Sequence, residues 1–161
     1  MLSQRRLAQR ARAIAAWLRR FFVELILRQI LKFRTLGRGP LEITAAVAEA
    51  IRGQRGEAVC QLFLRHTSAS LLIVENADPQ VLVDLEAWLA RAVPDGDALY
   101  RHTAEGPDDM PAHVRSVLCG VSLAVPVSQG RLQLGTWQGI FLWEHRSAPH
   151  SRELVLSLVP V

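Results

Sequence analysis

The chain has 161 residues, of which 50% are hydrophobic and 21% are charged. This length and composition suit one domain with its own core and leave too little chain for two. The two cysteines, Cys60 and Cys119, lie far apart in apolar segments, which argues against a disulfide framework or a zinc ribbon and favours buried thiols in the cytoplasm. The formal net charge of +4 comes from arginines that precede Glu24, so we expect no nucleic-acid partner.

The first segment, residues 1–23, differs from the rest because it alternates arginines with apolar residues. Between Ser3 and Phe22 the apolar residues recur at roughly helical spacing, which predicts a basic amphipathic helix. Such a helix can pack on the domain or on a neighbouring subunit, attach weakly to a membrane surface, or act as a targeting peptide. We expect it to be an appendage to one domain that spans residues 24–161.

Hydrophobic patterning in the remaining chain predicts alternating strands and helices, and hence an α/β fold. We expect strands at 25–33, 58–64 and 70–74, a turn at 37–40, a long loop at 95–109, and helices at 43–51, 79–93 and 111–119. Asp78 is the expected N-cap of the second helix, whose buried face would hold Leu82, Leu85 and Trp88. The four apolar runs after Gly120 (VSLAVPV, RLQLGTW, QGIFLWEH and ELVLSLV) predict an antiparallel meander.

Four of the five histidines fall at the ends of predicted elements or in the loop: His66, His102, His113 and His145. Neutral imidazoles that converge from different elements build transition-metal sites with a position left open for water or substrate. The chain has no H-E-x-x-H motif, so isolated surface histidines are the alternative.

Carboxylates accompany these histidines along the chain: Glu75, Asp78, Glu105, Asp108, Asp109 and Glu144. They could orient the imidazoles, bind a hard ion that carries phosphates, or act as acid and base. Solvated loop charge, or stabilisation of a helix N-terminus, explains them equally well.

Two further motifs interrupt predicted strands. The segment His66-Thr67-Ser68 superficially suggests a hydrolase triad, but the chain has no G-x-S-x-G motif. In Gly135-Thr136-Trp137-Gln138-Gly139 the glycines allow close backbone approach. Trp137 and Gln138 therefore either line a pocket or form a β-bulge at a subunit contact.

Five long motifs in order resemble the YjbQ-like family, also labelled secondary thiamine-phosphate synthase: HTSAS, ENADPQVLVDLEAWL, YRHTAEGPDDMPAHVRS, VSLAVPVSQGRLQLGTWQGIFLWEHR and SRELVLSL. The resemblance covers essentially residues 27–159. It implies a compact α+β sandwich of mostly antiparallel sheet with helices, assembled as a homotrimer. It also implies a histidine-lined pocket near subunit contacts that holds a divalent metal ion, with zinc expected and magnesium as the alternative for a pyrophosphate substrate.

The resemblance directs each role to particular residues of this chain. The expected metal ligands are His66, His102 and His113, with His145 as a substitute or extra ligand. The expected acid–base residues are Glu144, Asp109 and His145. The expected substrate contacts are Thr67, Ser68, Asn76, Thr136, Trp137, Gln138 and Arg146. Ser147 replaces an acidic residue that often follows the EHR motif.

The activity that the resemblance implies is thiamine-phosphate synthesis, in which a pyrimidine-methyl pyrophosphate joins a thiazole phosphate and pyrophosphate leaves. Negative charge develops on the departing pyrophosphate, so the site needs cations there. Arg146, Arg115 or a bound divalent ion could supply them. Because the chain has no Gly-rich phosphate loop and no D-x-x-D motif, the alternative is a trimeric protein that binds a metal or a phosphorylated metabolite without turnover.

Overall fold

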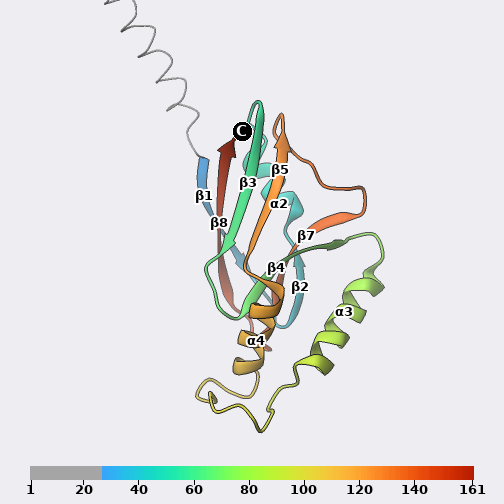
Figure 1. Ribbon diagram of the computed structural model, residues 1–161, viewed down its shortest axis with the longest axis vertical. Helices are drawn as coiled ribbons and strands as arrows, with labels where there is room; N and C mark the ends of the chain where they lie inside the picture. The colour runs from blue at the N-terminus through green and yellow to red at the C-terminus, as the bar shows by residue number, and fades with distance from the viewer. Residues whose placement is uncertain (1–26) are drawn as a thin grey trace, which may run out of the picture.

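The computed structural model describes residues 27–161, and the helix predicted at 3–22 lies outside the described residues. The described chain mixes strands and helices (Figure 1). In chain order the elements are β1 (Leu27–Arg34), β2 (Gly39–Glu42), α2 (Thr44–Ile51), β3 (Glu57–Leu64), β4 (Ala69–Glu75), α3 (Pro79–Ala92), α4 (Asp109–Cys119), β5 (Ser122–Ser128), β6 (Arg131–Leu132), β7 (Gln138–Glu144) and β8 (Ser151–Pro160). No helix among residues 27–161 is long and apolar enough to cross a membrane.

The strands form two antiparallel sheets. The larger sheet has the order β1-β8-β3-β5-β6, and the smaller has the order β2-β7-β4. The long strand β8 pairs with β1 on one side and with β3 on the other. The chain therefore has the expected α+β architecture.

One hydrophobic core lies between the two sheets. Strands β3, β5 and β8 bury every second side chain: Cys60, Leu62, Leu64, Val125, Val127, Leu154, Leu156 and Leu158. From the smaller sheet the core receives Leu71, Ile140 and Leu142, and from α2 and its N-cap it receives Ile43, Val47 and Ile51. The period of two in the strands and of four in the helix explains why the sequence pattern located these elements.

The predicted C-terminal meander is wrong. Only β5 and β6 form a hairpin, whereas β7 lies at the centre of the smaller sheet and β8 lies inside the larger one. Alternation of apolar residues shows that a segment is a strand with one buried face, but it does not show which strand lies beside it. Strand β8 buries Leu154, Leu156 and Leu158 almost completely, and it pairs with β1 on one side and β3 on the other.

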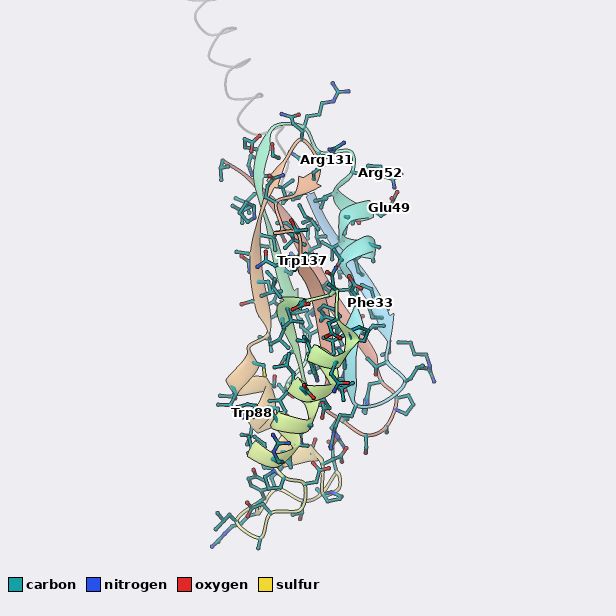
Figure 2. The ribbon with its side chains drawn as sticks, turned by 90° about the vertical axis from the view of Figure 1, so that its right-hand side faces the viewer. Phe33, Glu49, Arg52, Trp88, Arg131 and Trp137 are labelled. Atoms are coloured by element: carbon teal, nitrogen blue, oxygen red, sulfur yellow. The ribbon has the colours of Figure 1, made fainter. Side chains whose placement is uncertain are left out.

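Two local predictions also need correction. Pro40 belongs to a short strand, β2, where the sequence indicated only a turn; it is tolerated because β2 is an edge strand that pairs with β7 alone. In α3, Asp78 caps the helix as expected, since its Oδ1 accepts from the Gln80 amide at 2.9 Å. However, Trp88 is 55% exposed and Leu89 is the residue that α3 buries (Figure 2).

The fold brings three segments together at one end of the sheets. Ala69, the first residue of β4, pairs with Glu144, the last residue of β7. Helix α4 is fixed beside them because Ser116 Oγ donates to the Ala69 carbonyl at 3.1 Å. The β3–β4 turn, the end of β7 and the N-terminus of α4 therefore meet, and most of the predicted site residues lie on these segments.

Candidate functional site

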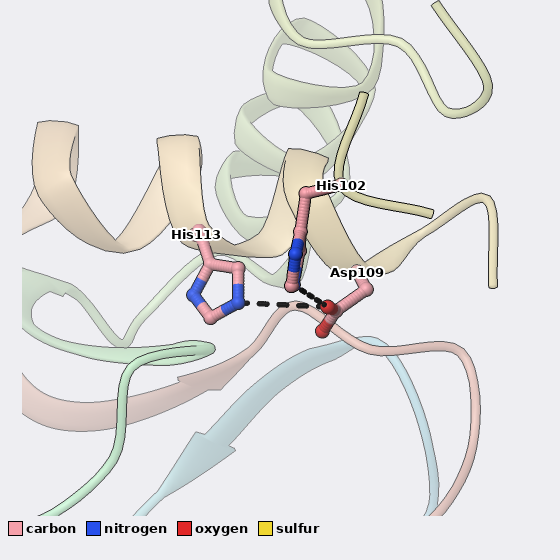
Figure 3. A group of neighbouring side chains, drawn as sticks. All are labelled: His102, Asp109 and His113. Carbon is pink, nitrogen blue, oxygen red and sulfur yellow. Dashed lines mark ion pairs between the residues drawn. The ribbon is translucent and has the colours of Figure 1, made fainter. Parts of the chain in front are cut away.

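His102, Asp109 and His113 form a compact cluster at the N-terminal end of α4 (Figure 3). Asp109 is the first residue of α4 and His113 follows one turn later, so both project from one face of the helix. His102 comes from the loop between α3 and α4. Its Nε2 lies 2.9 Å from Asp109 Oδ2, and His113 Nε2 lies 3.6 Å from the same oxygen.

The tautomer of His113 follows from its second ring nitrogen. Nδ1 lies 3.0 Å from the carbonyl oxygen of Thr67, and a carbonyl oxygen only accepts, so Nδ1 carries the hydrogen and donates it. In the neutral ring Nε2 then carries the lone pair, on the side that faces Asp109. A backbone carbonyl commonly orients a metal-binding histidine in this way.

Asp109 directs one buried carboxylate oxygen at the two imidazoles. Its Oδ1 accepts from Arg146 Nη1 at 2.6 Å, whereas Oδ2 is buried and forms no hydrogen bond of regular geometry in the part of the chain that the structure describes, although His102 Nε2 lies 2.9 Å away. A buried, unsatisfied carboxylate oxygen is costly unless an ion or water meets it. This oxygen faces the Nε2 atoms of both histidines.

The donor set fits a divalent metal ion. The three candidate ligand atoms lie within 4.8 Å of one another, and atoms about 2.0–2.1 Å from a tetrahedral zinc ion would lie roughly 3.3 Å apart. Two imidazoles with one carboxylate suit zinc or another transition ion better than magnesium, which prefers oxygen ligands. Three protein ligands leave at least one coordination position open.

Arg146 is committed to carboxylates rather than free to bind a substrate. Its guanidinium contacts Asp109, Asp108 Oδ2 at 3.3 Å and Glu105 Oε2 at 3.3 Å, and it donates to the Glu105 carbonyl at 2.8 Å. Burial acts to raise the pKa of Asp108, but hydrogen bonds from Ser147 and Arg146 outweigh it and lower the pKa to about 2. Ser147 thus serves as a donor to Asp108 through its amide and its hydroxyl.

Arg115, the other expected cation, is fully buried beneath α3 and away from solvent. Its Nη2 donates to the Val93 carbonyl at 2.8 Å, and its Nη1 lies 3.4 Å from Glu86 Oε1. It therefore fastens α4 to α3.

Glu144 is buried and saturated with donors. It accepts from Thr35 Oγ1 at 2.9 Å, from the Arg146 amide at 3.0 Å and from Arg152 Nε at 2.7 Å. Burial acts to raise the pKa of Glu144, but the bonds from Arg152, Arg146 and Thr35 lower it overall. The structure thus places Glu144 as an ionised anchor for Arg152, without the solvent access of an acid–base residue.

The other two predicted histidines lie outside the cluster. His145 is buried, its Nε2 lies 2.8 Å from Ser70 Oγ, and burial lowers its pKa to about 3. His66 Nε2 accepts from the Glu153 amide at 3.0 Å, which occupies its lone pair. Burial and the neighbouring Arg152 cation lower the pKa of His66. Neither imidazole offers a free lone pair beside Asp109.

The predicted substrate contacts separate into two groups. Thr67, Ser68 and Arg146 adjoin the cluster, and Ser68 Oγ accepts from Arg152 Nη2 at 3.0 Å. The remaining four lie at the opposite end of β4 and β7, where Glu75 pairs with Gln138: Asn76, Thr136, Trp137 and Gln138. Strand β7 has seven residues, so its ends are about 20 Å apart at about 3.3 Å per residue. Trp137 is 65% exposed (Figure 2).

Arg152 is the residue of this region that sequence reasoning missed. It is buried and joins Glu144, Ser68 and His66. A signal for it exists, because Arg152 occupies the same face of β8 as Leu154 and Leu156 and so is a charge in a row of inward positions.

Comparison with known proteins decides the family. Residues 29–160 match the family described as UPF0047 protein YjbQ-like. The chain belongs to this family. It is 58% identical over 98 residues to a UPF0047 protein of Synechocystis, covering 61% of this chain and 67% of the relative. It is 55% identical over 97 residues to YjbQ of Salmonella typhimurium, covering 60% and 70%.

Solved structures share the fold. The conserved hypothetical protein TT1486 of Thermus thermophilus superposes with a TM-score of 0.71 and 38% identity, covering 79% of this chain and 97% of that one. A YjbQ/UPF0047 protein of Clostridium acetobutylicum gives a TM-score of 0.71 and 30% identity, with 83% and 99% covered.

Proposed function

We propose that this YjbQ-like protein binds one divalent metal ion, preferably zinc, through His102, Asp109 and His113. The observation that carries the proposal is the convergence of two imidazoles on the buried Asp109 Oδ2, with His102 Nε2 at 2.9 Å and His113 Nε2 at 3.6 Å and no hydrogen bond of regular geometry to this oxygen among the described residues. The Thr67 carbonyl holds the ring of His113, and Arg146 holds the other oxygen of Asp109. His66, an expected ligand, is left out because its lone pair is occupied.

The reaction we propose for this site is thiamine-phosphate synthesis. The bond between the pyrimidine methylene carbon and the pyrophosphate oxygen breaks, a bond from that carbon to the thiazole nitrogen forms, and pyrophosphate leaves with the electron pair. When bound, the metal would neutralise charge on the departing pyrophosphate. The thiazole nitrogen attacks with its own lone pair, so no proton has to be removed. The engagement of Glu144 and His145 inside the protein is compatible with this chemistry.

A second function, binding of a metal or a phosphorylated metabolite without turnover, is favoured by Arg146. Its guanidinium is shared among Glu105, Asp108 and Asp109, so this expected phosphate contact is already neutralised.

We also propose that the protein is a homotrimer, as the family resemblance implies. A cytoplasmic location accords with two free cysteines, of which Cys60 is buried with its pKa raised to about 11.

The first experiment measures metal content and zinc affinity. We expect about one zinc per chain by elemental analysis, since three protein ligands and one open position complete a site. Asp109→Asn and His113→Ala should weaken zinc binding by more than the roughly 10- to 100-fold that loss of an orienting partner costs. His150→Ala is the matched control, because His150 contacts Ala148 outside the cluster. Unchanged zinc binding in both cluster variants would refute the proposed site.

The second experiment separates enzyme from binding protein. Zinc-loaded protein should form thiamine phosphate from the two phosphorylated precursors, and His113→Ala should lower the turnover rate on the order of a hundredfold. Binding of the precursors without turnover above a heat-inactivated control would establish the second function instead.

A further inference from the structure

An apolar hollow adjoins the metal-ligand cluster. Its volume is about 670 Å³, which lies within the roughly 300–1,000 Å³ of small-molecule sites. Strand β3, the β3–β4 turn and the C-terminal half of α4 supply its lining: Phe63, Leu64, Arg65, His66, Thr67, His113, Ser116, Val117, Gly120 and Val121. His113 and Thr67 belong to both the hollow and the cluster, so the two are continuous.

The continuity follows from helical geometry. Asp109, His113 and Val117 recur at intervals of four residues, and therefore lie along one side of α4. At about 1.5 Å per residue, Val117 lies roughly 6 Å beyond His113 along the helix axis, and Gly120 follows the end of the helix. A ligand of ordinary metabolite length that meets an ion at His113 can therefore reach the hollow.

The chemistry of the hollow favours an apolar group. Phe63 is 48% exposed and Val117 84%, so a ligand there would remove carbon surface from water. The polar side chains in the lining are largely committed elsewhere: Arg65 pairs with Glu153 at 3.0 Å, and Ser116 donates to the Ala69 carbonyl. A phosphate placed in the hollow would find no free cation in its lining.

We propose that ligands of the metal centre carry an aromatic or other apolar group that occupies this hollow, while their polar end meets the ion beside His113. The inference rests on the proposed metal centre. The inference adds a class of substrate to that centre, namely a molecule with a metal-binding head and an apolar body. A molecule with a phosphate at each end does not belong to this class.

The test compares acetohydroxamate with benzohydroxamate, which share a metal-binding head and differ by a methyl or a phenyl group. Calorimetry on the zinc-loaded, full-length protein should show benzohydroxamate binding roughly tenfold or more tightly, since the phenyl ring removes more apolar area from water. The double variant Phe63→Ser/Val117→Asn should lose this preference. Its zinc content and its affinity for acetohydroxamate should stay unchanged, which also shows that it is folded.

The matched control is Val83→Asn, because Val83 is an exposed valine of α3 that lies outside the hollow. This variant should keep the preference for benzohydroxamate.

Equal affinity for the two hydroxamates in a zinc-loaded protein would overturn the inference while the metal centre stands. Failure to hold zinc would overturn the metal centre itself. A double variant that dissociates into monomers, together with no preference in the original protein, would show that the hollow is a contact between copies and overturn the inference.

Discussion

The histidines differ most in what their ring nitrogens contact. His102 and His113 direct a nitrogen at the buried Oδ2 of Asp109 and are partly open to solvent, whereas His66 accepts from a backbone amide and His145 lies in the core beside Ser70. A metal ligand needs a free lone pair and a path for the ion. Of these four histidines, only the first pair meets both requirements beside a carboxylate.

The buried His145 should make the metal-free protein less stable as the pH falls below about 6.5. Its pKa is about 3 in the folded protein and about 6.5 in an unfolded chain. Between these values the unfolded chain binds a proton that the folded protein does not, so the free energy of unfolding falls by up to about 1.4 kcal/mol per pH unit. Urea denaturation at pH 7.5, 6.0 and 5.0 in the presence of EDTA measures this slope.

His145→Gln should reduce that slope, although the variant is less stable at every pH. A residual slope of the same sign is expected from His66, whose pKa burial also lowers. Asp108 contributes only at lower pH, between its ordinary value near 4 and about 2. An identical slope in the variant would show that His145 is not held neutral by the fold.

At the scale of elements, the connection between α3 and α4 determines whether the cluster can form, because it carries His102. Its two ends are joined by the bond from the Gly96 amide to the Pro107 carbonyl at 3.0 Å. Arg146, just after β7, holds the segment near Glu105 through both the carbonyl and the carboxylate. The position of the loop that carries His102 thus depends on Arg146, which lies just after strand β7.

Arg146→Gln should loosen this connection and destabilise the protein. Removing the guanidinium leaves Asp108 and Asp109 buried without their cation, a loss on the order of 3 kcal/mol. Amide hydrogen exchange at residues 98–105 should accelerate, and the melting temperature should fall. Arg91→Gln on the exposed surface of α3 is the control and should change neither. Unchanged exchange at 98–105 in Arg146→Gln would show that other contacts hold the loop.

The sequence located most elements because each has a one-sided apolar pattern, such as Val47 and Ile51 in α2 or Leu154 and Leu156 in β8. It did not predict the order of strands in the sheets, since the pairing of β8 with β1 and β3 joins segments far apart in the chain. Likewise, the positions of the histidines and carboxylates along the sequence allow several sets of metal ligands, and His102, His113 and Asp109 are only one of these sets. Separating them from His66 required the backbone contacts of each ring.

At the scale of the whole molecule, the family match and the described fold both begin shortly after the segment 1–23. Strand β1 pairs with β8 from Leu27 to Arg34. The family match begins at residue 29. The segment 1–23, predicted as a basic amphipathic helix, therefore lies outside the family match.

Deleting residues 1–23 should leave fold, zinc binding and the proposed trimer intact, because the family match begins after them. Circular dichroism, zinc titration and light scattering on the full chain and on residues 24–161 test this. The deletion removes six arginines and no acidic residue, so the formal net charge changes from +4 to −2. Binding to anionic phospholipid vesicles should accordingly be seen only with the full chain, and it should weaken as salt is raised. Loss of the trimer on deletion would assign the apolar face of the segment to subunit packing, and equal vesicle binding by both proteins would place any membrane contact on the domain itself.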